Sequence, residues 1–89
     1  MKIKKGFMLR KVAQDNVVIP IGAASVNLNG IIRLNEAGTL LWQELAAHDV
    51  SAEELTELLI REYGISKEQA EGDVQAFLKM LEPANCLEP

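Results

Sequence analysis

Two helix-start signals lie close together in the second half of the chain, and they constrain its fold more than any other feature. Residues 51–54 (SAEE) and 66–69 (SKEQ) both fit a capping box, in which a serine caps a helix and the side chain three residues later caps the serine in return. Gly64 ends the first helix, because glycine adopts the left-handed conformation at little cost. Only Gly64 and Ile65 then join the two helices. This spacing predicts a tight helix-turn-helix unit.

Apolar residues repeat at helical spacing in three segments of the chain. A first helix is expected from the N-cap Asn35 through Ala47, with an apolar side of Leu40, Leu41, Trp42 and Leu45. In the second helix the i, i+3, i+4, i+7 positions are Leu55, Leu58, Leu59 and Glu62. The third helix, from Ser66 to Leu81, has the stripe Ala70, Val74, Phe77, Leu78 and Leu81. Pro83 then ends or distorts it, and Asn85 is suited to a left-handed conformation.

The first third of the chain has the pattern of a β-hairpin. Residues 7–12 (FMLRKV) mix apolar and basic side chains, as an exposed strand does, and residues 17–19 (VVI) are β-branched. Residues 15–16 (DN) provide turn chemistry between them. Pro20 cannot donate a hydrogen bond to a sheet, so it closes the second strand or lies on its solvent-facing edge.

A third strand is expected over residues 30–34 (GIIRL). Because side chains alternate along a strand, Ile32 and Leu34 lie on one face and Ile31 and Arg33 on the other. The whole chain of 89 residues has the length of one small domain, so residues 1–89 are expected to form a single unit. Its predicted fold class is α+β, winged helix-turn-helix-like, with a three-stranded antiparallel sheet followed by three helices.

The composition opposes several classes of function. Cys86 and His48 are the only residues of their types, which excludes an intrachain disulfide and a zinc cluster of histidine and cysteine ligands. Both are expected to be structural, Cys86 in the core and His48 at a helix end. The glycine spacing fits no phosphate loop, and no nucleophile has an evident base. We therefore expect a protein that is not an enzyme and that needs no cofactor or metal.

The charge is distributed unequally along the chain. Residues 1–34 carry six basic side chains and one acidic, a net charge of +5, whereas residues 35–89 carry three basic and twelve acidic, a net charge of −9. The third helix is acidic, which opposes the binding of nucleic acid in a groove. No segment has the pattern of a membrane span or a signal peptide, so we expect no membrane partner and a cytoplasmic location.

A three-stranded sheet offers one mode of binding that needs no catalytic residue. An uncovered edge presents free N–H and C=O groups, and an extended peptide can add there as a further strand. If the third strand is that edge and the third helix lies beside it, apolar side chains from both line a groove. The alternative is that Ile31, Ile32 and Leu34 simply fill the core.

The order and spacing of several short segments resemble the PqqD family over nearly the whole chain. These segments are residues 16–20 (NVVIP), 29–38 (NGIIRLNEAG), 41–42 (LW), 58–59 (LL) with Tyr63, 73–74 (DV), 77–78 (FL) and Leu81. The resemblance implies a peptide chaperone, also called a recognition element for ribosomally made and modified peptides. Such a protein binds the leader segment of a precursor peptide and presents it to a modifying enzyme, typically a radical S-adenosylmethionine enzyme.

The resemblance also implies where the leader binds, namely as a strand beside the third strand and along the third helix. On this chain the expected contacts are Ile31, Ile32, Arg33, Leu34, Asp73, Ala76, Phe77 and Met80. Arg33 is then placed to pair with a leader carboxylate, and Phe77 and Met80 to pack against apolar leader side chains.

Some positions depart from the family pattern, and some alternatives stay open. Residues 48–50 (HDV) replace the Asp-Gly turn of many relatives, and Asn85 replaces a glycine. These departures affect turns, but they leave open whether the pathway is pyrroloquinoline quinone synthesis or another. A winged-helix DNA-binding regulator and a structural adaptor of an enzyme complex remain alternatives. The chain is expected to be a monomer, although an exposed strand edge also allows a dimer or an exchanged segment.

Overall fold

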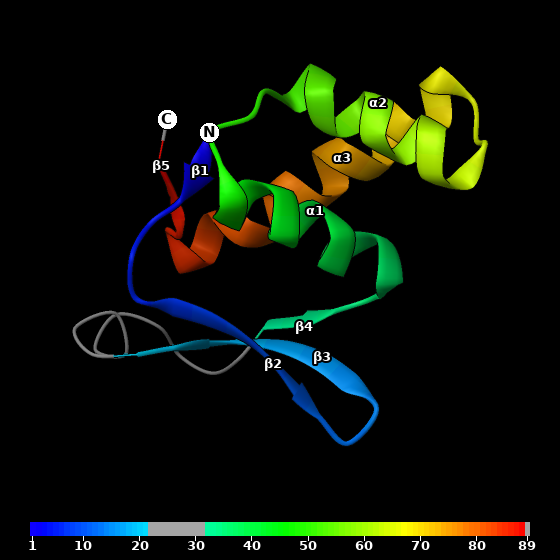
Figure 1. Cartoon of the computed structure of the whole chain (residues 1–89). Helices are drawn as coiled ribbons and strands as arrows, with labels where there is room; N and C mark the ends of the chain where they lie inside the picture. The colour runs from blue at the N-terminus through cyan, green and yellow to red at the C-terminus, as the bar shows by residue number, and fades with distance from the viewer. Residues whose placement is uncertain (22–31, 89) are drawn as a thin grey trace.

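A computed structural model describes residues 1–21 and 32–88 of the chain, and Figure 1 shows their arrangement. The elements are β1 (Lys2–Ile3), β2 (Phe7–Val12), β3 (Asp15–Pro20), β4 (Ile32–Leu34), α1 (Glu36–Ala47), α2 (Ala52–Tyr63), α3 (Lys67–Leu81), the 3-10 helix η2 (Glu82–Ala84) and β5 (Leu87–Glu88). The predicted α+β class is confirmed. Within the described segments, no helix is long and apolar enough to cross a bilayer.

The three longer strands form an antiparallel sheet in the order β2-β3-β4. Val18 pairs with Leu9 on one side and with Ile32 on the other, which places these three side chains on the face toward the helices. The sheet lies on one side of α1, and α2 and α3 lie on the other (Figure 1). Residues 30 and 31 of the predicted third strand lie outside the described residues.

The hairpin turn is two positions earlier than expected. Asp15 belongs to β3 and pairs with Val12, so the turn is residues 13–14, with Ala13 at a φ of 57°. The prediction of a turn at residues 15–16 was wrong because the pairing that buries Val18 determines the register.

The predicted helix caps are present. The Asn35 side chain accepts a hydrogen bond of 2.7 Å from the Gly38 N–H, and Ser51 and Glu54 form both bonds of a capping box. Ser66 caps α3 by accepting from the Gln69 N–H at 3.1 Å.

One position of the predicted apolar pattern is wrong. Glu62 is exposed, and the buried polar residue of α2 is Thr56. The Thr56 hydroxyl donates a hydrogen bond of 2.9 Å to the Ala52 carbonyl, so the side chain is buried without an unpaired polar atom.

The two glycines Gly64 and Gly72 give a first test of the turn between α2 and α3. Gly64 has a φ of +64°, a conformation that costs an alanine about 1–2 kcal/mol. Gly72 lies within α3, and a Cβ added to it would meet no atom within 4 Å. We expect Gly64→Ala to lower the free energy of unfolding by about 1–2 kcal/mol, and Gly72→Ala to raise it by about 0.5–1 kcal/mol. Urea denaturation followed by circular dichroism measures both, and equal effects of the two variants would contradict the assigned turn.

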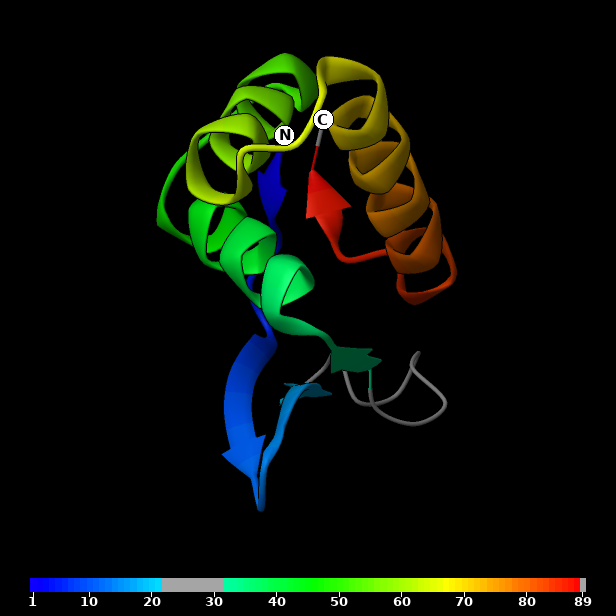
Figure 2. The same cartoon turned by 90° about the vertical axis from the view of Figure 1, so that its right-hand side faces the viewer.

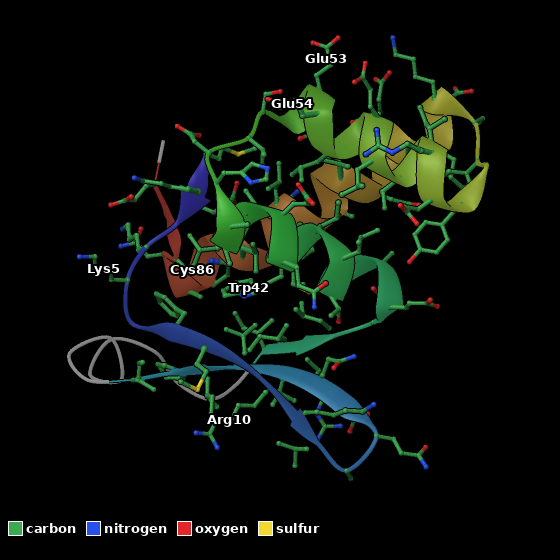
Figure 3. The ribbon with its side chains drawn as sticks, viewed as in Figure 1. Lys5, Arg10, Trp42, Glu53, Glu54 and Cys86 are labelled. Atoms are coloured by element: carbon green, nitrogen blue, oxygen red, sulfur yellow. The ribbon has the colours of Figure 1, made fainter. Side chains whose placement is uncertain are left out.

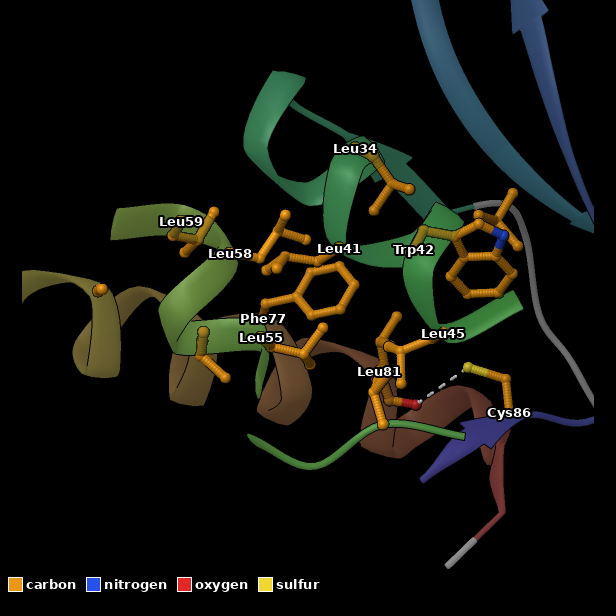
Figure 4. Close-up of a cluster of buried hydrophobic side chains, with 14 of the residues drawn as sticks. Leu34, Leu41, Trp42, Leu45, Leu55, Leu58, Leu59, Phe77, Leu81 and Cys86 are labelled. Carbon is orange, nitrogen blue, oxygen red and sulfur yellow. Dashed lines mark hydrogen bonds between the residues drawn. The ribbon is translucent and has the colours of Figure 1, made fainter. Parts of the chain in front are cut away.

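The core lies where α1, α2, α3 and the inner face of the sheet meet. Leu41, Leu45, Leu55, Leu59, Leu81, Val18, Val74 and Cys86 are almost fully buried. The Phe77 ring enters this cluster beside Leu41 and Leu55 (Figure 4). Trp42 lies against Phe7 of β2, with ring centroids 6.5 Å apart at 73°. This edge-to-face pair joins α1 to the sheet.

The two ends of the chain form a second small sheet that the sequence pattern does not indicate. Lys2 pairs with Glu88 and Ile3 with Leu87, and Figure 2 shows β1 beside β5. The N-terminal ammonium donates to the Val50 carbonyl at 2.8 Å and to the Asp49 carboxylate. The hydrogen bond from the ammonium to the Asp49 carboxylate lowers the pKa of Asp49. The ionised carboxylate therefore stabilises the folded protein above its ordinary pKa, and this stabilisation is lost as the pH falls through the lowered value.

Cys86 is a core residue, as predicted, and its reactivity tests the closed C-terminal turn. It follows Asn85, which has a φ of 52°, and its Sγ lies 3.9 Å from the Leu81 carbonyl oxygen. Burial raises the pKa of the Cys86 thiol, because the core favours the uncharged, protonated form. The buried thiol therefore stabilises the fold below its ordinary pKa, and this stabilisation is lost as the pH rises through the raised value. We expect Ellman's reagent at pH 8 to react at least about tenfold more slowly with the folded protein than in 6 M guanidinium. Equal rates would contradict a closed turn.

Candidate functional site

An open cleft lies between strand β4 and helix α3. Its volume is about 420 Å³, and it is lined by Arg33, Leu34, Asn35, Ala37, Gly38, Leu41, Leu59, Asp73, Ala76, Phe77 and Met80. Among the described residues β4 pairs with β3 alone, so it is an edge strand of the sheet. The cleft therefore lies next to a strand edge, with the first turn of α1 at one end of that strand.

Helix α3 contributes one continuous face to the cleft. Asp73, Ala76, Phe77 and Met80 are spaced at i, i+3, i+4 and i+7, which places them along one side of the helix. Phe77 is only 6% exposed, so it belongs to the core and also forms part of the cleft wall. Met80 is 43% exposed, and Ala76 and Asp73 are exposed as well. All four α3 positions predicted from the sequence thus line one cleft.

Strand β4 brings only some of its predicted residues to this cleft. Leu34 is buried and lines it, and Arg33 lies at its rim. Ile32 is half-buried on the core side of the sheet and does not line it. Ile31 lies outside the described residues. The Arg33 guanidinium is 3.8 Å from the Asp15 carboxylate, and both side chains are exposed, so this ion pair contributes little to stability.

The N-cap and first two turns of α1, together with one residue of α2, complete the cleft, and the sequence prediction omits them. These residues are Asn35, Ala37, Gly38, Leu41 and Leu59. A Cβ at Gly38 would lie 3.0 Å from the Asn35 Oδ1 atom, so the glycine allows the capped turn to pack closely against Leu34. The N-cap Asn35 directly after the strand was a signal for this arrangement, because it forces the helix to start at the end of β4.

The cleft has the chemistry of a binding surface. Its lining is mostly aliphatic and aromatic, with one guanidinium, one carboxylate and one amide. His48 is exposed at the end of α1, with its Nε2 atom 3.1 Å from the Glu44 carboxylate, and Cys86 is in the core. Neither residue lines the cleft. In the parts of the chain that the structure describes, no group of three or more metal-ligating side chains is gathered.

The unequal charge of the sequence becomes a separation in space. Arg10 extends from the outer face of the sheet, whereas Glu53 and Glu54 extend from the start of α2 at the opposite side of the molecule (Figure 3). The cleft lies between these two regions, with Arg33 from the sheet and Asp73 from the helices.

The chain belongs to the PqqD family. The model of the family described as coenzyme PQQ synthesis protein D matches residues 17–87, which include every element that lines the cleft. The predicted family membership is therefore confirmed. No curated protein sequence matches the chain.

Two solved structures have a similar fold. TbiB1, solved in complex with the TbiA(beta) leader peptide, is 22% identical, with a TM-score of 0.75 over 99% of this chain and 95% of that one. The lasso peptide synthetase B1, complexed with its leader peptide, is 20% identical, with a TM-score of 0.72 over 99% of this chain and 96% of that one. The fold of this chain is thus shared with TbiB1 and with the lasso peptide synthetase B1.

Proposed function

We propose that this chain is a non-catalytic recognition protein that binds the leader segment of a ribosomally made precursor peptide and presents it to a modifying enzyme. The observation that carries the proposal is the cleft beside an edge strand, with the Asp73, Ala76, Phe77 and Met80 face of α3 as its wall. Family membership supports it, and so do the two similar folds that were solved with leader peptides bound.

The leader adds as a fourth strand next to β4. The main-chain groups of β4 that pair with no described strand give affinity that does not depend on sequence, and the cleft selects side chains from alternate positions of the peptide. Phe77 and Met80 pack against an apolar leader side chain, and Met80 adapts to its shape because it is flexible and exposed. Arg33 pairs with a leader carboxylate in exchange for its long contact with Asp15. Ile32 contributes the backbone edge rather than the cleft lining. The proposed contact of Ile31 with the leader follows from its place next to Ile32 in the sequence.

The modifying enzyme supplies the chemistry, and we propose a radical S-adenosylmethionine enzyme for this role. The described residues that line the cleft include no hydroxyl, thiol or imidazole, which supports a binding role that needs no cofactor. We place this function in the cytoplasm, where precursor peptides are made, and in a monomer that can pair or exchange a segment through its strand edge.

The test is a titration with the N-terminal segment of each short peptide that is found to be encoded beside this gene, made as a fluorescein-labelled peptide. We expect saturable binding in the micromolar range or better by fluorescence anisotropy, and no binding of a scrambled peptide. The absence of saturable binding would overturn the proposal and favour an adaptor that binds the enzyme directly. Strong, salt-sensitive binding of duplex DNA would instead favour a regulator.

A further inference from the structure

The cleft beside β4 continues past Asp73 into a second hollow. This hollow of about 480 Å³ is lined by Asn35, Glu36, Ala37, Leu59, Tyr63, Ile65 and Asp73. It shares Asn35, Ala37, Leu59 and Asp73 with the cleft. The two form one groove, which starts at Met80, passes the end of β4 and reaches Tyr63 and Ile65. We call the part beyond Asp73 the groove extension.

The groove extension is acidic. Glu36 and Asp73 line it together with Tyr63. Reduced contact with solvent raises the pKa of the Tyr63 phenol, and the negative charges of Glu36 and Glu62 raise it further. None of these three carboxylates forms an ion pair with another described residue.

The basic residues of the helices lie elsewhere. Arg61 and Lys67 line hollows on other faces of the molecule, and Lys79 is exposed but lines neither part of the groove. A cation that enters the extension therefore meets carboxylates without a competing basic side chain in its lining.

The groove extension also offers an apolar and aromatic surface. Tyr63 is 40% exposed at its end, and Ile65 is half-buried beside it. A lysine or arginine has an aliphatic stem and a charged head, so it matches a surface that combines a ring with carboxylates.

We propose that the leader peptide carries a basic side chain next to the segment that adds to β4, and that this side chain binds in the groove extension against Asp73. The inference rests on the proposed function and goes beyond it by naming a feature of the substrate. Both strand pairs of the sheet are antiparallel, and the extension lies past the C-terminal end of β4. An antiparallel leader therefore places there the residue that precedes its strand segment.

The test compares two carboxylate removals on the same helix against the fluorescein-labelled leader peptide. Asp73→Asn is expected to weaken binding by about fivefold at low salt, whereas Glu71→Gln, which makes the same change of charge outside the groove, weakens it by less than about twofold. Each lysine and arginine of the leader is also replaced by glutamine. One replacement, before the strand segment, should weaken binding to the wild-type protein but have no further effect on Asp73→Asn.

The outcomes separate this inference from the function on which it rests. Leader binding that Asp73→Asn leaves unchanged, or an effect of Asp73→Asn that adds to that of every leader substitution, overturns the basic-residue proposal and leaves the function intact. A wild-type protein that binds no leader peptide overturns the function itself. Circular dichroism of both variants checks that each is folded, which is expected because both carboxylates are exposed.

Discussion

Replacing Ala76 with tryptophan is expected to weaken leader binding by about 30-fold or more while the protein stays folded. Ala76 lies on the cleft face of α3, one turn from Met80, and its side chain is exposed. An indole at this position fills space that the peptide needs next to β4. Because the change adds atoms to an exposed helix position, it disturbs no core contact. Fluorescence anisotropy gives the affinity, and thermal unfolding checks the fold.

The matched control for this variant is Gln75→Trp. Gln75 is the preceding residue on α3 and lines a hollow on another face, so the same indole is added to the same helix outside the cleft. We expect the affinity of this variant to stay within about twofold of the wild type. Equal loss in both variants would indicate a general effect of an exposed tryptophan and would contradict the cleft as the binding site.

Substitutions at Met80 and Leu81 are expected to separate binding from stability. Leu81 is completely buried, and Leu81→Ala should lower the free energy of unfolding by about 2–5 kcal/mol, a large part of the total for a domain of this size. Its Tm should fall by about 10 °C or more. Met80 is 43% exposed in the cleft, so Met80→Ala should change the stability by less than about 1 kcal/mol but weaken leader binding several-fold.

The two residues are neighbours on one helix, so each variant is the control for the other. Below its lowered Tm, Leu81→Ala should bind the leader with nearly the wild-type affinity. The assignment of these two helix faces fails if Met80→Ala unfolds the protein, or if Leu81→Ala remains as stable as the wild type.

Most of the fold follows from local signals in the sequence. Asn35, Ser51, Ser66 and Gly64 mark helix ends by hydrogen bonds and backbone conformations that involve only a few adjacent residues, and for this reason the helix positions were predictable. The hairpin turn was not, because the pairing of Val18 with Leu9 and Ile32 depends on contacts between strands. The sheet of β1 and β5 was also missed, because two-residue strands are too short to have a periodic pattern.

The cleft illustrates the same limit at the level of the site. The helical spacing from Asp73 to Met80 and the family resemblance give the α3 wall, and the structure places all four residues there. The N-cap Asn35 directly after β4 was a local signal for the wall from α1, whereas Leu59 of α2 reaches the cleft through the way the helices cross, which no single segment encodes. Ile32 was expected at the site, but its side chain packs against the core and does not line the cleft, although Leu34 on the same face of β4 does.

The most direct test of strand addition is the set of backbone amide shifts during a titration of labelled protein with the leader peptide. We predict that the changes concentrate on residues 30–34 and on the face of α3 from Asp73 to Met80, and that the amides of β4 become protected from hydrogen exchange. Changes centred on β2 or on the outer face of α2, with β4 unaffected at saturation, would contradict the account.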